Sequence, residues 1–291
     1  MAEVPPRPRP APYRLAAFAV ALTAVLGCGV AWAALPPGGA GRLTAVEVVG
    51  TAFRVATADG RVLQGRALRG ATLWLELTPG AAPQPVRLDQ IVPDPADRFG
   101  DLLLYRMRRL DPATGRAEEL CDPDATGARW AFPLAGRWDA EGRRISEHGL
   151  TLACAAEGAI GKCVRWGYRP WARSGDVSLA PYHQACVRMV RADYCGGHGT
   201  TRDGMSIDLF DRLGINRPEP GGGPAHLSFE AAWGPEGALC VAHPRVPAKI
   251  SWPVLTANCP RLTGRLGPEK CLEGAAREGQ YGTALVFNRS R

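Results

Sequence analysis

The sequence predicts an α+β fold, mainly antiparallel β with a few helices, in which disulfides hold the C-terminal part together. Three observations support this prediction: strand–turn–strand patterns over the first 150 residues, one amphipathic helical segment at about 178–194, and eight cysteines confined to 121–271. Gly (35) and Pro (26) make up about a fifth of the 291 residues, a proportion typical of short strands joined by many turns.

Pairs of strand-like segments flank turn sequences along the first half of the chain. The pairs are 43–57 with 61–68 around Asp59-Gly60, 101–110 with 116–121, and 129–138 with 143–154. Residues 71–78 alternate like a half-buried strand, and the Pro-rich passage 79–98 is expected to be a loop or linker. Further strand–turn–strand patterns cover 199–210 and 227–242, and 267–278 is expected to contain a short helix.

The clearest helix is predicted for 178–194, with Ser178 as N-cap and Gly196-Gly197 as C-cap. Its apolar stripe includes Cys186 and ends at Asp193. Cys186 and Cys195 are nine residues apart, which is about 13.5 Å of helical rise. Because a disulfide requires Cα atoms about 4.4–6.8 Å apart, these two cysteines are not expected to pair.

Nine cysteines are present, and Cys28 lies in an N-terminal apolar segment apart from the others. The remaining eight are Cys121, Cys154, Cys163, Cys186, Cys195, Cys240, Cys259 and Cys271. An even number outside the cytoplasm predicts four disulfides, with 105 possible connectivities. Because the chain has no CxxC or HxxxH pair, no metal site is expected, and no motif indicates a cofactor.

The N-terminal segment 1–35 has the pattern of an export signal or membrane anchor. Arg7, Arg9 and Arg14 precede the uncharged run 15–35. Three outcomes fit this pattern: cleavage after Ala33, lipidation of Cys28 as a new terminus, or an uncut run that spans a bilayer. Each places the rest of the chain outside the cytoplasm, so the protein is expected to be extracytoplasmic (secreted, periplasmic or membrane-anchored).

The distribution of cysteines suggests how the exported part is organised. After a linker at 36–42, residues 43–118 form a β-rich N-terminal part without cysteines, and residues 119–275 form a disulfide-rich part. These two parts could form one domain. Residues 276–291 are expected to be a C-terminal tail.

Several separated motifs carry a resemblance to a known family. They are QACVRMVRADYCGGHGTTRDG at 184–204, GRWD at 136–139, CAAEGAIGKCVRWGYRPW at 154–171 and IDLFDRLGI at 207–215. Over roughly residues 45–275 the chain resembles the ADYC-domain family of exported bacterial proteins. Because that family has no assigned activity, the resemblance implies an exported protein and carries over no catalytic residue.

Asp193 is the most informative polar residue, because it lies on the apolar stripe of the predicted helix, beside Met189. A buried carboxylate needs partners. In a structural interpretation it accepts hydrogen bonds from backbone N–H groups of Gly196–Thr200. In a catalytic interpretation it acts as acid or base, with His198 nearby. His183 is a third candidate, although about 15 Å of helix separates it from Asp193.

Trp166, Tyr168 and Trp171 form a dense aromatic group with Arg165 and Arg169. Such groups stack on sugar rings or grip peptides, and they also fill the cores of disulfide-rich domains. They are the candidate binding residues. Asp208 and Asp211 lack the spacing of a calcium loop and are expected to be solvent-facing carboxylates.

No Gly-x-Ser-x-Gly elbow is present, and the +7 net charge is scattered, which argues against a nucleic-acid partner. The leading hypothesis is a non-catalytic exported module that binds an envelope protein or glycan, with membrane contact only through the N-terminal segment. The alternatives are an extracytoplasmic hydrolase using Asp193 with a nearby His, and a purely structural envelope protein.

Overall fold

The computed structural model describes residues 33–34, 43–78, 80–156, 158–223 and 226–291. Cys28, the linker 36–42 and all but two residues of the segment 1–35 lie outside the described residues, so the fate of this segment stays a prediction. Within the described ranges, no helix has both the length and the hydropathy needed to cross a bilayer.

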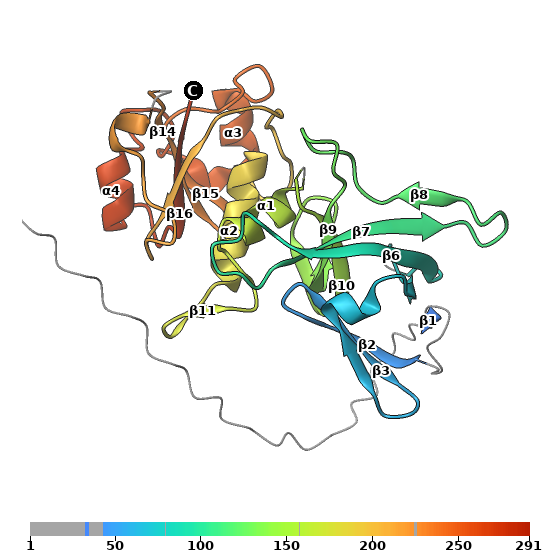
Figure 1. Ribbon diagram of the computed structural model, residues 1–291. Helices are drawn as coiled ribbons and strands as arrows, with labels where there is room; N and C mark the ends of the chain where they lie inside the picture. The colour runs from blue at the N-terminus through green and yellow to red at the C-terminus, as the bar shows by residue number, and fades with distance from the viewer. Residues whose placement is uncertain (1–32, 35–42, 79, 157, 224–225) are drawn as a thin grey trace, which may run out of the picture.

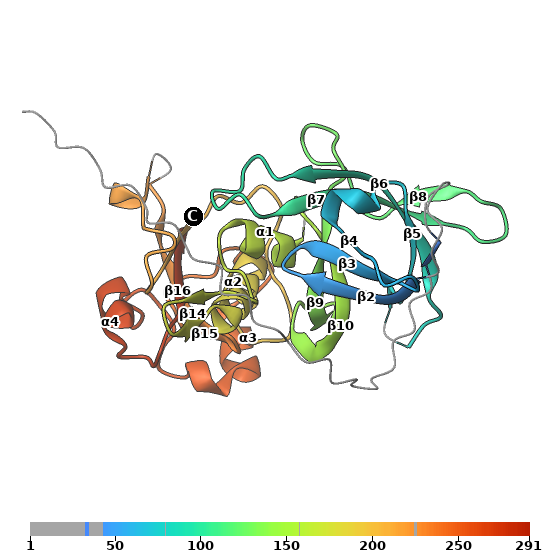
Figure 2. The same ribbon diagram turned by 60° about the horizontal axis from the view of Figure 1, so that its bottom comes forward.

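The first half of the chain is antiparallel β structure built from two sheets (Figure 1). The larger sheet has the order β1-β5-β6-β7-β9-β10, with β8 also paired to β7, and the smaller has the order β2-β3-β4. The elements are β1 (Ala33–Ala34), β2 (Leu43–Val49), β3 (Ala52–Thr57), β4 (Val62–Gln64), η1 (Gly65–Leu68), β5 (Thr72–Leu75), β6 (Gln84–Pro93), β7 (Leu103–Leu110), β8 (Ala117–Glu119), β9 (Ala131–Trp138) and β10 (Arg144–Cys154). Because β2 and β3 pack against β9, both sheets share one buried core (Figure 2).

Two predictions of secondary structure in this half are wrong. The segment 79–98, expected to be a loop, contains β6, which pairs with both β5 and β7. Pro85 and Pro93 lie near the two ends of β6, where a missing N–H is tolerated. Between these prolines, Val86 and Leu88 are buried in the core. The segment 43–57 is a hairpin and not one strand, because Gly50 takes a positive φ of 62° between β2 and β3.

The second half contains a four-stranded antiparallel sheet with the order β13-β16-β14-β15 (Figure 1). Its elements are α1 (Ala159–Arg165), β11 (Arg173–Ser174), β12 (Val177–Ser178), α2 (Ala180–Arg191), β13 (Asp208–Asp211), η2 (Pro220–Gly222), β14 (Ser228–Gly234), β15 (Gly237–Val241), α3 (Trp252–Asn258), η3 (Pro260–Leu262), α4 (Glu273–Glu278) and β16 (Val286–Ser290). The sheet is buried on both faces: Trp233 and Val286 belong to the core under α2, and Phe287 belongs to the core under α4. The α+β fold class is therefore confirmed.

The C-terminal segment 276–291, expected to be a tail, includes β16, which pairs with both β13 and β14. The strand–turn–strand expected at 199–210 is also wrong, because only β13 forms there. The backbone N–H groups of Thr200 and Thr201 instead donate to the carbonyl of Arg191 at the end of α2. The short helix expected within 267–278 is confirmed as α4.

Helix α2 is shorter than the predicted 178–194. It begins at Ala180, with Leu179 rather than Ser178 in the N-cap position, and Pro181 lies in its first turn. It ends at Arg191, because Ala192 takes the left-handed conformation (φ 48°) in the place that Gly196 was expected to fill. Asp193 therefore lies beyond the helix, and its backbone N–H donates to the carbonyl of Arg188 at 2.9 Å.

All eight cysteines predicted to pair do so. The disulfides are Cys121–Cys154, Cys163–Cys186, Cys195–Cys259 and Cys240–Cys271, with Cα–Cα distances of 5.3–5.8 Å. Cys186 and Cys195 have different partners, as the helix geometry required. The first disulfide joins the end of β10 to the chain after β8, so the N-terminal β structure is also stapled. Four disulfides are compatible with an extracytoplasmic protein.

Aspartate–arginine pairs join the two halves. In the loop between β6 and β7, Asp94 accepts two hydrogen bonds from Arg165 of α1, at 2.6 and 3.1 Å. In the same loop Asp97 accepts one from Arg169 at 2.5 Å. Both aspartate side chains are at most 1% exposed, so these pairs fix the position of α1 and the residues after it on the first half.

Candidate functional site

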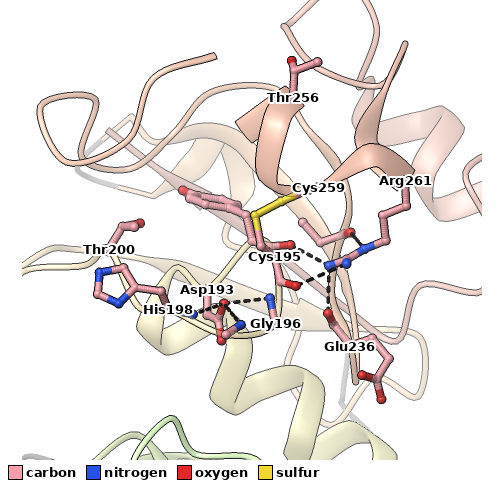
Figure 3. Close-up of a disulfide and its surroundings, with 12 residues drawn as sticks. Asp193, Cys195, Gly196, His198, Thr200, Glu236, Thr256, Cys259 and Arg261 are labelled. Carbon is pink, nitrogen blue, oxygen red and sulfur yellow. Dashed lines mark hydrogen bonds between the residues drawn. A yellow bond between two sulfur atoms is a disulfide. The ribbon is translucent and has the colours of Figure 1, made fainter. Parts of the chain in front are cut away.

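Residues 192–195, which carry the family resemblance, lie at the exit of α2 against the loop between β14 and β15 (Figure 3). Ala192 supplies the left-handed turn that ends the helix. Asp193 and Tyr194 are fully or almost fully buried, and Cys195 forms a disulfide with Cys259. Each of the four residues has a separate contact that fixes this turn.

The Asp193 carboxylate holds the turn closed. Its Oδ1 accepts hydrogen bonds from the backbone N–H groups of Gly196, Gly197 and His198, at 2.8, 2.9 and 3.0 Å. Its Oδ2 accepts one from the Arg188 guanidinium at 2.5 Å, and both side chains are at most 1% exposed. The structural interpretation, in which Asp193 binds backbone amides of the turn, is confirmed. We call Asp193, Arg188 and the three amides the Asp193 clasp.

The imidazole rings of the two histidines considered as catalytic partners make no hydrogen bond to this carboxylate. The ring of His198 points away from it, although the backbone N–H of the same residue donates to it (Figure 3). His183 is buried in α2, where its Nε2 lies 3.2 Å from the carbonyl oxygen of Ile160 and its ring packs edge-on against Trp138. Burial lowers the pKa of His183 to about 4, so its imidazole is neutral near pH 7.

Tyr194 connects the clasp to a buried ionic network. Its hydroxyl donates to Glu230 of β14 and accepts from the backbone N–H of Arg245, both at 2.8 Å. Burial is the main reason that its pKa lies above the usual value, so the phenol stays neutral. Arg245 binds Glu230 at 2.9 Å and also donates to the carbonyl of Met189 in α2.

Sequence reasoning missed this network. Glu230 also accepts from Asn288 of β16 at 2.7 Å, so one buried carboxylate ties the central strands of the sheet to α2. The available signal was a lone Glu within the alternating run Ser228–Gly234, where the neighbouring positions are apolar. Nothing near Arg245 in the sequence indicates its partner.

Arg261 closes the turn from the other side. Its guanidinium donates to the carbonyl oxygens of Tyr194 and Glu236 at 2.8 Å, and to that of Cys195 at 3.2 Å (Figure 3). Gly196 is required beneath it, because its φ is 88° and a Cβ there would lie 2.5 Å from the carbonyl oxygen of Glu236. Arg261 therefore ties the turn to the β14–β15 loop through main-chain carbonyl oxygens.

The aromatic group at 166–171 does not form one binding surface. Tyr168 is fully buried, and its hydroxyl donates to Asp211 at 2.8 Å, so for this residue the core interpretation is confirmed and the binding interpretation is wrong. Trp166 is partly buried, whereas Trp171 is 38% exposed and lies beside Gly50 of the β2–β3 turn. Of these three aromatic residues, Trp171 is the exposed one.

The carboxylates Asp208 and Asp211 are occupied and not solvent-facing as expected. Asp208 is 7% exposed and binds Arg289 at 3.1 Å. Asp211 accepts three backbone N–H bonds within its own loop in addition to the Tyr168 hydroxyl. Within the part of the chain that the structure describes, no group of three or more His, Cys, Asp or Glu side chains is arranged to hold a metal ion.

The first half contains an open pocket of about 200 Å³ between the end of β5, the chain after β8 and the β9–β10 hairpin. Four leucines and the Cys121–Cys154 disulfide supply most of its wall; the leucines are Leu77, Leu120, Leu150 and Leu152. Its charged lining is the pair in which Arg137 of β9 donates to Glu76 after β5 at 2.7 Å. These residues are far apart in the sequence, so no local pattern could have indicated the pocket.

Comparison with known proteins gives one family. A model of the ADYC domain matches residues 65–247, and it therefore runs across the boundary that the cysteine distribution suggested at 118/119. No curated protein and no solved structure matches the chain. Because the match covers well over half of the 291 residues, the chain belongs to the ADYC domain family.

Proposed function

We propose that this protein is a non-catalytic binding module that works outside the cytoplasm and is exported or anchored by its N-terminal segment. The main observation in favour of a non-catalytic protein is the Asp193 clasp. Both oxygens of the one carboxylate proposed for acid–base chemistry are occupied, by three backbone amides and by Arg188. A general acid or base must reach the proton that it transfers, and this carboxylate is fully buried.

The other catalytic candidates support the same proposal. Cys195 forms a disulfide with Cys259, so it offers no thiolate to pair with His198. His183 is enclosed by Trp138 and Ile160 and lies away from the Asp193 clasp. The alternative of a hydrolase using Asp193 with a nearby His therefore has no supporting contact among the described residues.

Two surface features support a binding role. The 200 Å³ pocket of the first half has apolar walls and one charged pair, which is the usual composition of a ligand site. Trp171 exposes an aromatic surface beside the β2–β3 turn. The partner is proposed to be a protein or glycan of the cell envelope, and a role that is structural alone would leave both features unused.

The proposal is tested by screening the purified full-length chain against peptide and glycan arrays, and in parallel against ester, peptide and glycoside substrates. We expect saturable binding to one class of ligand and no turnover. Turnover that is lost in His198→Ala, at an unchanged melting temperature, would establish the hydrolase. Absence of binding to either array would favour the structural role instead.

A further inference from the structure

We propose that the pocket beside β10 receives one apolar side chain of a polypeptide, so that the partner of this module is a peptide and not a glycan. This inference rests on the proposed binding function. It is carried by the size of the pocket, by the aliphatic nature of its walls and by the donor and acceptor at its charged pair.

The pocket is too small for a ligand of drug size, since such sites measure about 300–1,000 Å³. A volume of about 200 Å³ accommodates a single large side chain, whose apolar surface leaves water when it enters. The walls formed by Leu120, Leu150 and Leu152 are aliphatic, and they match the branched or aromatic side chains that anchor peptides in grooves.

Sugar rings are recognised mainly by stacking on an open aromatic face, and the pocket offers none. Trp138 is its aromatic lining residue, and it is only 7% exposed. The Arg144 guanidinium lies 5.3 Å from the centre of the Trp138 ring, and the His183 ring packs against it at 5.6 Å. The guanidinium of Arg144 and the ring of His183 therefore cover the indole of Trp138, which disfavours a glycan at this position.

The charged pair selects a neutral polar group. Arg137 offers donors beside Glu76, whose Oε1 accepts from the backbone N–H of Gly80 and whose Oε2 accepts from Arg137, and each oxygen keeps a second lone pair for a ligand. The side chains of Arg137 and Glu76 are 23% and 28% exposed. Hydrogen bonding to Arg137 is the main reason that the pKa of Glu76 is lowered, which keeps the pair ionised. A ligand carboxylate would be repelled by Glu76, and a ligand amine would be repelled by Arg137. In an extended segment the N–H and C=O of one residue point to the same side of the chain, so a single residue offers an N–H to Glu76 and a C=O to Arg137 and satisfies both.

The experiment is a titration of the full-length chain, labelled at its leucine methyl groups, followed by NMR. The probes are N-acetyl-leucine amide and its matched control N-acetyl-glycine amide, which has the same peptide groups without the side chain. N-acetylglucosamine and its disaccharide form the glycan arm. We expect saturable shifts of the Leu150 and Leu152 methyl signals with the leucine probe, at least ten-fold weaker binding of the glycine probe, and no shift of these signals with either sugar.

Two variants test the assignment. Leu152→Trp fills the pocket and is expected to weaken binding of the leucine probe at least ten-fold. Its control is Ile145→Trp, on the same strand at a 49% exposed position that does not line the pocket, and binding there is expected to be unchanged. Glu76→Gln removes the repulsion of anions. N-acetyl-leucine, which has a free carboxylate, is therefore expected to bind the Glu76→Gln variant about ten-fold more tightly than it binds the unmodified chain.

The outcomes separate this inference from the proposed function. Shifts of Leu150 and Leu152 with the sugars would overturn the peptide class while a binding module remained. If the protein binds a ligand on an array but that ligand leaves the Leu150 and Leu152 methyl signals unchanged, the pocket is not the binding site, and only this assignment is overturned. Absence of binding to every array and probe would overturn both. If Leu152→Trp fails to fold, the Glu76→Gln selectivity decides, and equal affinity for the anionic probe would contradict the inference.

Discussion

Replacement of Asp193 by Asn tests the clasp with the smallest change of shape. The amide oxygen of Asn can still accept from Gly196, Gly197 and His198. The amide NH₂ would instead face the Arg188 guanidinium, which now lies 2.5 Å from Oδ2. Two donors would then oppose each other in a site that is at most 1% exposed, and the Arg188 charge would remain buried without its counter-ion.

The expected magnitude follows from this arrangement. Removal of one partner from a buried ion pair costs about 3–5 kcal/mol, because the remaining charge is uncompensated. Arg188 would keep its bond from Nε to the carbonyl of Pro235 at 3.2 Å, which offsets a small part of that cost. Asp193→Asn is therefore expected to lower the free energy of unfolding by about 3–4 kcal/mol.

The assay is equilibrium unfolding in denaturant followed by tryptophan fluorescence, with the disulfides intact. The controls are Arg188→Met and the double variant Arg188→Met, Asp193→Asn, in which the pair is neutral. Because the charge left by the single change is absent in the double variant, the double loss should be smaller than the sum of the two single losses by about 1–3 kcal/mol. A loss below about 1 kcal/mol for Asp193→Asn, or strict additivity, would refute the reasoning.

Three further predictions concern the rest of the fold. The folded-state pKa of His183, about 4, lies below its unfolded value of 6.5, so stability should fall by up to about 3 kcal/mol as the pH drops from about 6.5 to 4; pH-dependent unfolding checks this, and an equal slope in His183→Phe would contradict it. Asp94→Asn removes the buried partner of Arg165 at the junction and should cost about 2 kcal/mol; calorimetry should show the two halves beginning to melt separately, and an unchanged single transition would contradict this. Replacement of Cys121 and Cys154 by Ala opens a loop with a sequence separation of 33 and should cost about 4 kcal/mol, measured by denaturant unfolding; a cost near zero would show that the loop stays closed without the bond.

The sequence predicted the features that depend on short-range pattern. The alternation and turn residues around Asp59-Gly60 located a hairpin, and helical periodicity located α2 to within three residues at each end. The same geometry correctly separated Cys186 from Cys195. Errors occurred where pairing with distant strands decided the outcome. The Pro-rich run containing β6 and the supposed tail containing β16 are strands because neighbours on both sides pair with them.

The candidate site was predicted in part. The buried carboxylate of Asp193 and its backbone partners followed from its place on the apolar stripe of the predicted helix, since a buried charge needs donors. Its pairing with Arg188 was not foreseen, because five residues separate the two and the helix was expected to continue past both. Glu230 and Arg245 lie farther apart still, and a network of this kind becomes visible only once the chain is folded.

Native-state hydrogen exchange of the amides of Gly196, Gly197 and His198 tests the central claim, that Asp193 serves the fold and is not free for chemistry. We expect all three amides to exchange only through global unfolding, at the same rate as the slowest amides of α2, and we expect Asp193→Ala to abolish this protection. Rapid exchange of these three amides in the unmodified protein, while α2 stays protected, would show an open carboxylate and would contradict the account.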